Sequence, residues 1–407
     1  MDFSDTREEA EYRAKVRAFL DANAEKREPG KLFQAKYGDD NLVPLAKKWQ
    51  RKKYDAGFAG ITLPKEYGGQ GGTQIQQVIY NQEEQNYLVP RGVYEIGLGM
   101  CIPTMLTYAT EAQKQRYAPA ALKGDEIWCQ LFSEPAAGSD VANSKTRALR
   151  DGDDWIINGQ KIWTSGAHFS DFGIIVVRTD PSVPKHKGMS FFFLDMKSPG
   201  IEVRRIKQIS GTSNFNEVFF TDVRVPDSQR LGGVGEGWRV ALTTLMNERL
   251  AVGMTPPPDF DEIFAFTRSV ELESGPAIRD SSVRERLADW YVEMQGLKLT
   301  QFRTITALSR GEAPGPEASI TKIISANKRQ DIANFAMDLM EQGGVAMGAD
   351  QPMAGLFQEA MLSSPSGRIA GGTDEILRNI IAERVLGLPQ DIRVDKDVPF
   401  DQLPSGR

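Results

Sequence analysis

The chain has 407 residues, of which 40% are hydrophobic, and this length is enough for two or three subdomains with sizeable cores. Its 49 basic and 55 acidic residues give a net charge of −6, and the sequence has no long basic run. Nucleic acid and anionic membranes are therefore not expected as main partners, although the composition leaves room for a local positive patch that binds a phosphorylated ligand.

Histidine and cysteine are scarce in this sequence. With only His168 and His186, we expect no multi-histidine metal centre. Cys101 and Cys129 are far apart in sequence, which argues against a disulfide scaffold and fits a reducing compartment. Residues 1–5 lack the basic and apolar regions of a signal peptide, and no apolar run approaches the roughly 20 residues of a membrane span. We therefore expect a cytoplasmic protein without a membrane partner.

Residues 1–125 have the apolar spacing of amphipathic helices, interrupted by glycine and proline. The pattern predicts an N-terminal helical domain over these residues. Its helices are expected at residues 8–23, 42–56, 74–87 and 110–123.

Residues 126–235 change to short runs of β-branched and aromatic residues, which predict a small β-barrel or sandwich domain. The clearest runs are residues 174–177, 190–194 and 217–220. Two dipeptides of this region, Asp151-Gly152 and Asn158-Gly159, are hairpin signals.

Helical periodicity returns over residues 236–407, which predicts a C-terminal antiparallel helix bundle. The first helix is expected at about residues 237–254, before three consecutive prolines. Gly233, Gly235 and Gly237 do not have the spacing of a nucleotide-binding loop, so we expect them to let the chain turn from the β-domain into this helix. The fold class is thus α+β with three parts, but the order of the parts does not name a function.

Two unusual strings lie close together, Trp-Cys-Gln-Leu-Phe-Ser-Glu-Pro-Ala-Ala-Gly-Ser-Asp at residues 128–140 and Asn-Gly-Gln-Lys-Ile-Trp-Thr-Ser-Gly at residues 158–166. Both are rich in small hydroxyl and glycine positions, which bring backbone N–H groups and side-chain oxygens close to a flat polar ligand. Trp163 could lie against an isoalloxazine ring. Read singly, these residues would be ordinary strand-end hydroxyls and a core tryptophan.

With these strings the chain resembles the acyl-CoA dehydrogenase family, from about residue 8 to residue 389. The resemblance implies FAD as the cofactor, with Phe132 and Ser133 along the flavin edge. It places Trp163, Thr164 and Ser165 over the other side of the flavin. Ser139 matches a position that approaches the bound acyl-CoA, although a Gly-Ser-Asp turn is also common for local reasons.

A third string, residues 368–376, also matches the family. Gly372 and Thr373 enter a helix with free N–H groups and a capping hydroxyl, which suits a polar part of the cofactor, and a plain helix cap is the alternative. The resemblance adds Gly343, Gly344 and Glu375 to the cofactor-binding positions. Gly371 stands where many relatives carry the catalytic glutamate, so that position can line the substrate but cannot abstract a proton.

The family has a second place for its base, on the first helix after the β-domain, and there this sequence carries Glu248. Glu248 shares a helical stripe with apolar residues and is therefore expected to face inward. A carboxylate in an apolar site has a raised pKa, which makes it a usable base near neutral pH. A buried Glu paired with an Arg for structure is the alternative. Arg249 points about 100° away, and we treat it as structural or as a remote CoA contact.

The resemblance implies α,β-dehydrogenation of an acyl-CoA, in which Glu248 takes the α-proton and flavin N5 takes the β-hydride. It also implies an electron-transfer flavoprotein as acceptor and a homo- or heterotetramer. The sequence departs from most relatives at residues 269–276, where an arginine donated to the neighbour's FAD is missing, and at Met340, where glutamine is common. These departures favour an α2β2 assembly, as in the branch that acts on sterol side chains. A non-catalytic subunit and a flavin-dependent monooxygenase are the rival functions.

Overall fold

The computed structural model describes residues 5–35, 39–251, 257–309, 315, 318–393 and 395–404. These residues form two compact units, each made of segments that are far apart in the sequence. Unit 1 combines residues 1–34, 73–89 and 252–390, and unit 2 combines residues 35–72, 90–251 and 391–407. The three-part boundaries expected from the sequence stay a prediction.

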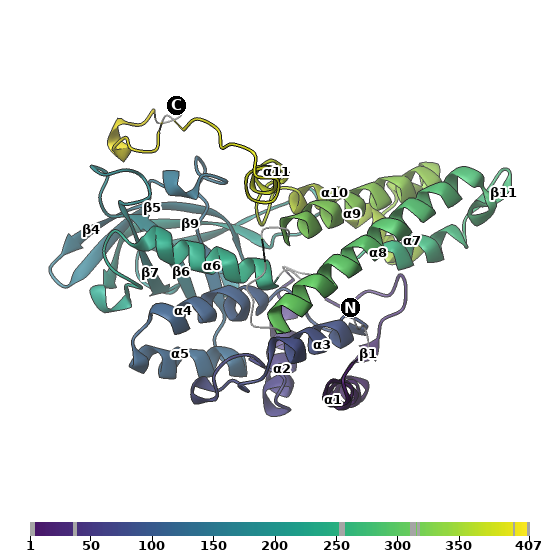
Figure 1. Cartoon of the computed structure of the whole chain (residues 1–407), viewed down its shortest axis with the longest axis horizontal. Helices are drawn as coiled ribbons and strands as arrows, with labels where there is room; N and C mark the ends of the chain where they lie inside the picture. Colours follow the sequence, from purple (N-terminus) through teal and green to yellow (C-terminus); the bar gives the residue numbers. More distant parts are fainter. Residues whose placement is uncertain are drawn as a thin grey trace. The chain divides into compact units, whose positions relative to one another are not determined.

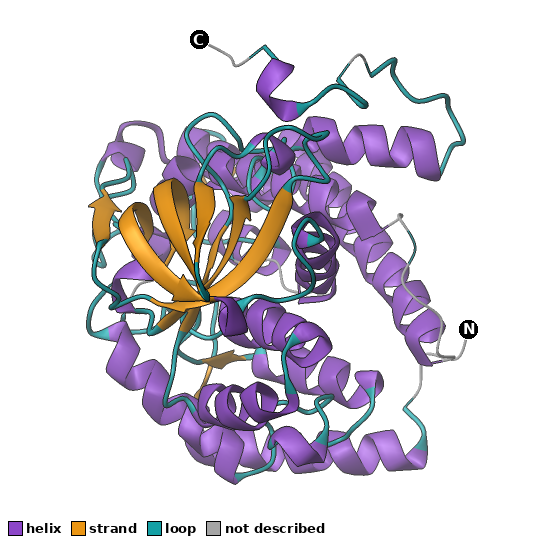
Figure 2. Ribbon diagram, turned by 90° about the vertical axis from the view of Figure 1, so that its left-hand side faces the viewer, coloured by secondary structure: helices purple, strands orange, loops and turns teal. Residues whose placement is uncertain are grey.

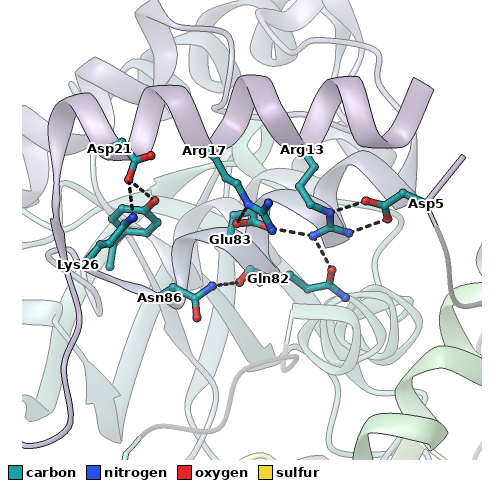
Figure 3. Close-up of polar contacts among 9 residues, drawn as sticks. Asp5, Arg13, Arg17, Asp21, Lys26, Gln82, Glu83 and Asn86 are labelled. Atoms are coloured by element: carbon teal, nitrogen blue, oxygen red, sulfur yellow. Dashed lines mark hydrogen bonds and ion pairs between the residues drawn. The ribbon is translucent and has the colours of Figure 1, made fainter. Parts of the chain in front are cut away.

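Unit 1 begins with helix α1 (Arg7–Asn23), which packs against α3 (Gln74–Glu84). Glu83 of α3 is buried and accepts hydrogen bonds from the guanidinium groups of Arg13 and Arg17 on α1 (Figure 3). These charge-assisted bonds fix how the two helices cross. The helix expected at residues 74–87 ends early because the chain turns after Glu84 into a short strand, β2 (Tyr87–Leu88), which pairs with β1 (Glu25–Lys26).

The remainder of unit 1 is helical, and the expectation of a C-terminal helix bundle is confirmed. Its core gathers apolar side chains of several helices, with Phe266, Trp290 and Phe357 among the largest. The elements are α7 (Phe260–Thr267), strands β10 (Glu271–Leu272) and β11 (Gly275–Pro276), η6 (Ala277–Arg279), α8 (Ser281–Ser309), α9 (Ala318–Met340), η7 (Glu341–Val345), η8 (Pro352–Gly355), α10 (Leu356–Gly367) and α11 (Asp374–Arg384).

Unit 2 combines helices with the sheet expected in the middle of the chain (Figure 1). One apolar core lies between these helices and one face of the sheet, and it includes Met105, Trp128, Phe191 and Val240. The helical elements are α2 (Leu42–Asp55), η1 (Lys65–Tyr67), η2 (Gly97–Cys101), α4 (Ile102–Tyr108), α5 (Glu111–Lys123), η3 (Val141–Asn143), η4 (Ala167–Phe169), η5 (Asp227–Gln229), α6 (Gly237–Ala251) and η9 (Phe400–Gln402).

The sheet of unit 2 has seven strands in the order β3-β6-β4-β5-β9-β8, with β7 paired to β6, and Figure 2 shows it strongly curled. Alternate residues of β6 enter two different cores, so that Ile174 packs toward the helices and Ile175 into the second core. The strands are β3 (Trp128–Leu131), β4 (Arg147–Asp151), β5 (Asp154–Ser165), β6 (Phe172–Arg178), β7 (Met189–Asp195), β8 (Ile201–Ile206) and β9 (Phe215–Pro226).

Of the two hairpin signals, only one marks a hairpin. Asp151-Gly152 connects β4 to β5, as expected. Asn158-Gly159 instead lies inside β5, where the register with β9 shifts between Ile157 and Gly159. A Cβ at Gly159 would lie 2.7 Å from the Cα of Thr146, so glycine is needed there for a bulge and a close approach of two strands.

The glycines before α6 have two roles. Gly235 has a φ of 81°, which fits the expected turn into the helix. Gly237 instead allows close packing, because a Cβ there would lie 2.5 Å from the carbonyl carbon of Ser190 on β7. The first turn of α6 therefore rests directly on the sheet.

Cys101 and Cys129 are both buried free thiols. Within the described ranges, no helix combines the length and the apolar character that crossing a membrane requires.

Candidate functional site

A buried ion pair joins the two strings of the sheet unit. Lys161, whose side chain is 0% exposed, donates from Nζ to Glu134 Oε1 at 2.8 Å and to the carbonyl oxygen of Phe132 at 3.0 Å. Glu134 also accepts hydrogen bonds from the backbone N–H groups of Lys145 and Thr146. With these partners both buried charges are satisfied, and the pair holds the loop after β3 against β5.

Burial and pairing act in opposite directions on this ion pair. Burial alone would raise the pKa of Glu134, but the charge of Lys161 and its hydrogen bonds hold that pKa below its usual range. Burial lowers the pKa of Lys161, and Glu134 opposes this. Each charge therefore depends on the other.

Phe132 and Ser133 lie on the loop that this pair holds. The carbonyl oxygen of Ser133 accepts a hydrogen bond from the N–H of Ile162 at 2.9 Å, and the Phe132 ring packs edge-on against Phe191 at 5.7 Å. The predicted flavin-edge residues are thus fixed to β5 through the backbone and to the core through an aromatic ring.

Trp163 has an unusual backbone and an exposed ring. Its φ of 59° lies in the left-handed region, which costs a residue other than glycine roughly 1–3 kcal/mol. The register between β5 and β9 shifts between Lys161 and Thr164, so Trp163 lies in this irregular stretch. The side chain is 55% exposed and touches Phe215 edge-on. The strained backbone therefore presents an aromatic ring at the surface.

Thr164 and Ser165 follow at the end of β5, and a polar network fixes Thr164. The carbonyl oxygen of Thr164 accepts from Asn216 Nδ2 at 2.8 Å, and Asn216 Oδ1 lies 3.0 Å from Nδ1 of His168. The hydroxyl of Thr164 is buried and has no hydrogen-bond partner among the described residues. Thr164 is thus held in place through its backbone carbonyl group.

Ser139 lies exposed on the loop between β3 and η3, and its neighbour Asp140 is held by an ion pair with Lys185. Glu248 and Arg249 belong to α6, but their side chains lie outside the described residues. The same helix is fixed one turn earlier, where the hydroxyls of Thr244 and Thr104 lie 2.9 Å apart in a buried contact between α6 and α4.

The predicted positions of unit 1 form a turn at the start of α11. Gly371 and Gly372 have φ values of 68° and 90°, a left-handed conformation that favours glycine. Thr373 caps the helix by accepting from the N–H of Ile376, which confirms the expected capping hydroxyl. Glu375 is exposed in the first turn of α11.

The buried carboxylate of Asp374 holds this turn in place. Asp374 accepts a hydrogen bond from Arg368 Nε at 2.8 Å and lies 3.7 Å from Nζ of Lys322. Lys322 also donates to the carbonyl oxygen of Gly372 at 2.6 Å. Burial raises the pKa of Asp374, but hydrogen bonds from Arg368 and from Asn327 Nδ2, at 3.3 Å, hold it below its usual range.

The second glycine pair of unit 1 lies on η7. Gly344 is buried, and a Cβ there would meet the side chain of Met337 at 3.1 Å, whereas a Cβ at Gly343 would meet nothing within 4 Å. Met340, which begins this turn, receives an N–H···S contact from Gln358 at 3.5 Å.

Phe132 and Ser133 thus contact Lys161 and Ile162, which directly precede Trp163, Thr164 and Ser165. The second group, Gly371, Gly372, Thr373 and Glu375, lies on one turn. The sequence did not predict roles for Lys161, Glu134, Asn216 or His168 in holding the first group. Two of these residues could have been found from the sequence. Lys161 and Glu134 are charged residues of opposite sign, one in each string, and each lies close to apolar residues that are typical of a strand.

Comparison with known families gives three matches along the chain. The family model described as acyl-CoA dehydrogenase, N-terminal domain, matches residues 6–125, the middle-domain model matches residues 129–223, and the C-terminal-domain model matches residues 235–386.

Individual proteins agree with these matches. The acyl-CoA dehydrogenase IpdE1 of Mycobacterium tuberculosis is 33% identical over 94% of this chain and 98% of its own length. FadE34 of the same organism is 38% identical over 83% of this chain, which spans only 45% of FadE34. Among solved structures, the Tcur3481-Tcur3483 steroid ACAD superposes with a TM-score of 0.80 at 28% identity, covering 96% of this chain and 100% of its own.

Proposed function

Because this chain belongs to the acyl-CoA dehydrogenase family, we propose that it converts an acyl-CoA to the trans-2-enoyl-CoA with Glu248 as the base. Members of this family are FAD-dependent oxidoreductases that act on acyl-CoA thioesters, and the chain is an enzyme of this kind. The observation that carries the proposal is the exposed ring of Trp163, which a left-handed backbone presents in the string that the resemblance places over the flavin.

The chain offers two sets of residues that suit the cofactor, one in each unit. Ser133, Thr164 and Ser165 offer hydroxyl and backbone groups, and Trp163 offers an exposed ring for stacking. In unit 1, Gly372 and Thr373 begin α11 and offer backbone N–H groups for a polar part of FAD or for the thioester carbonyl. Bound FAD supplies the acceptor for the two electrons that leave the substrate.

Glu248 suits the role of base because of its place on α6. Position 248 follows the buried Thr244 by one helical turn, and Gly371 excludes a base at the other position that the family uses. A carboxylate in an apolar setting binds the α-proton more readily than one in water. Hydrogen bonds to the thioester oxygen would make that proton more acidic.

We further propose a tetramer, either of this chain alone or as α2β2 with a related chain, and an electron-transfer flavoprotein as acceptor. Exposed apolar side chains on α8, Tyr291, Val292 and Leu299, give unit 1 a surface suited to assembly. The hairpin of β10 and β11 occupies the region from which the family donates an arginine to a neighbour's FAD. A sterol-type acyl group is the preferred substrate class, by similarity to the steroid ACAD.

The test is the visible spectrum of the purified protein during anaerobic addition of octanoyl-CoA or a sterol side-chain CoA thioester. We expect a yellow protein that one of the thioesters bleaches, and a Glu248→Gln variant that keeps FAD but bleaches about 10³-fold more slowly. Glu273→Gln, at an exposed position of the hairpin, makes the same chemical change and should bleach normally.

The rival functions give different spectra. If Glu248→Gln bleaches as fast as the unaltered protein, the base lies elsewhere. A yellow protein that no thioester bleaches, but that consumes oxygen when supplied with reduced flavin, would favour the monooxygenase. A colourless protein would favour a subunit that needs a related chain to hold FAD.

A further inference from the structure

The residues after α11 leave unit 1 and join the compact unit that contains the sheet. Figure 1 shows the described part of this C-terminal tail, residues 391–393 and 395–404, in yellow beside the strands of unit 2. The match to the family model ends at residue 386, so the tail lies beyond it.

The first fixed contact of the tail is made through Lys185. Its Nζ lies 2.7 Å from Oδ2 of Asp140 and 2.5 Å from Oδ2 of Asp395, and the residue is buried. One ammonium group therefore binds a carboxylate of the loop after β3 and a carboxylate of the tail together. Such a shared, largely desolvated cation restrains both segments.

The second fixed contact is made through Arg178 at the end of β6. Its guanidinium carbon lies 3.8 Å from the centre of the Phe400 ring, an arrangement that favours a cation–π interaction. The same guanidinium group donates to the carbonyl oxygens of Ala142 and Ser144. Arg178 is buried, so the ring of Phe400 covers a cation that fixes η3.

Backbone hydrogen bonds add to these side-chain contacts. The N–H of Phe400 donates to the carbonyl oxygen of Val183 at 3.0 Å, and the N–H of Asp401 donates to that of Pro181 at 3.0 Å. The tail is therefore held along the loop between β6 and β7 as well as at its two anchoring side chains.

Both anchors hold residues that follow Ser139 in the sequence. Asp140 is its immediate neighbour, and Ala142 and Ser144 follow on η3 and at its end. On the other side, a Cβ placed on Gly138 would meet nothing within 4 Å, so the loop has no close packing there. The contacts with Lys185 and Arg178 hold this loop in place from its far side.

We propose that the C-terminal tail is a positioning element for the acyl-CoA, which holds the Ser139 loop in its binding conformation through Lys185 and Arg178. This inference rests on the proposed function, because it assigns Ser139 to the acyl-CoA. A loop held in the bound conformation before the ligand arrives costs less ordering free energy on binding. The tail should therefore affect the affinity for acyl-CoA more than the rate of the chemical step.

The test is a double variant, Asp395→Asn with Phe400→Ala, in the full-length protein. We expect the Kd of octanoyl-CoA, or of whichever thioester bleaches the flavin, to rise about tenfold. We expect the FAD content and the kcat at saturation to stay within about twofold, since small differences in binding do not alter the chemical step. The matched control, Asp397→Asn with Ile392→Ala, makes similar changes at two exposed tail positions.

Lys185 allows a second comparison. Lys185→Met removes both ion pairs and should raise the Kd as the double variant does, while Lys185→Arg keeps a cation and should restore it. Hydrogen exchange supplies a readout that needs no substrate: amides of residues 138–144 should exchange faster in the double variant than in the control.

The outcomes distinguish a failure of the tail proposal alone from a failure of the proposed function. If the unaltered protein is bleached but the double variant binds acyl-CoA normally, the tail proposal is wrong and the proposed function stands. Unchanged exchange at residues 138–144 would also overturn it, as would an equal loss of FAD, kcat and affinity, because the tail would then only stabilise the fold. If no thioester binds to the unaltered protein, both proposals fail together.

Discussion

The two sets of predicted cofactor residues are supported in different ways. In unit 2, the buried ion pair of Lys161 and Glu134 binds the carbonyl oxygen of Phe132, and Asn216 on the adjacent strand binds that of Thr164. In unit 1, the turn at Gly372 is held by the buried carboxylate of Asp374 and by two cations that are less buried than Lys161, because the side chain of Lys322 is 16% exposed and that of Arg368 is 39% exposed.

This difference in burial predicts a difference in rigidity between the two sets of residues. A loop fixed by buried groups keeps its shape before a ligand binds, and the strained backbone of Trp163 persists only because its surroundings are rigid. A turn whose cations are partly exposed has a weaker restraint, because water can replace their contacts with the buried Asp374. Apolar side chains next to this second set are also exposed, with Val345 at 83% and Ile369 at 66%. We therefore expect the set in unit 2 to keep its shape without a ligand and the set in unit 1 to be ordered less firmly.

The largest loss of stability is expected when the buried cation is removed with Lys161→Met. Glu134 would then be an uncompensated buried carboxylate, and we expect a loss of about 3–5 kcal/mol in the free energy of unfolding together with loss of FAD. Urea unfolding and the absorbance of bound flavin measure the two effects.

Lys145→Met is the matched control, because the side chain of Lys145 is exposed and only its backbone N–H contacts Glu134. It should unfold at the same urea concentration as the unaltered protein. A Lys161→Met protein that keeps both its stability and its FAD would mean that the ion pair does not support the flavin loop.

A smaller effect is expected from the matching change in unit 1, Asp374→Asn. The amide keeps one hydrogen bond to Arg368 and loses the charge, while Arg368 can turn toward water. We expect a loss of about 1–3 kcal/mol in the free energy of unfolding. Asp338→Asn, at an exposed position of α9, is the control and should change nothing measurable. A loss larger than that of Lys161→Met would reverse the comparison between the units.

Local patterns predicted much of this fold because they depend on neighbours in sequence. The helix expected at residues 8–23 is observed at Arg7–Asn23, since Thr6 caps it and Val16 and Leu20 form its buried stripe. The helix expected at residues 74–87 was placed too long, because pairing of β2 with β1 ends it. That pairing joins segments about sixty residues apart, and the spacing of apolar residues within a short window carries no information about it.

For the candidate site, too, the sequence predicted the residues within each string but not the partners that hold them. Hydroxyl and glycine positions are visible in the strings themselves, and they led to Ser133, Thr164 and Thr373. The partners that fix them come from other strands, as Asn216 on β9 does for Thr164, and only the fold reveals these. The tail contacts of Lys185 and Arg178 were invisible for the same reason, because they join residues about two hundred positions apart.

The smallest expected effect is a pH dependence that differs in sign between the units. Both histidines of the chain, His168 and His186, lie in unit 2, and burial lowers the pKa of each below its usual 6.5. For His168 the nearby Arg205 lowers it further. Near pH 6.5 these histidines therefore bind protons more readily in the unfolded chain than in folded unit 2. The stability of unit 2 consequently falls as the pH drops from 7 toward 5.

In unit 1, burial raises the pKa of Glu293 above its usual 4.5, so its folded form binds a proton more readily than the unfolded chain. Acidification through that raised pKa therefore favours folded unit 1. Hydrogen exchange at pH 7 and pH 5.5, after correction for the intrinsic rate, should show lost protection around β5 and β9 but not along α8. The variant His168→Asn can still donate to Asn216 and does not titrate, so it should flatten the response near Thr164. An equal loss of protection in both units would mean that histidine titration does not distinguish them.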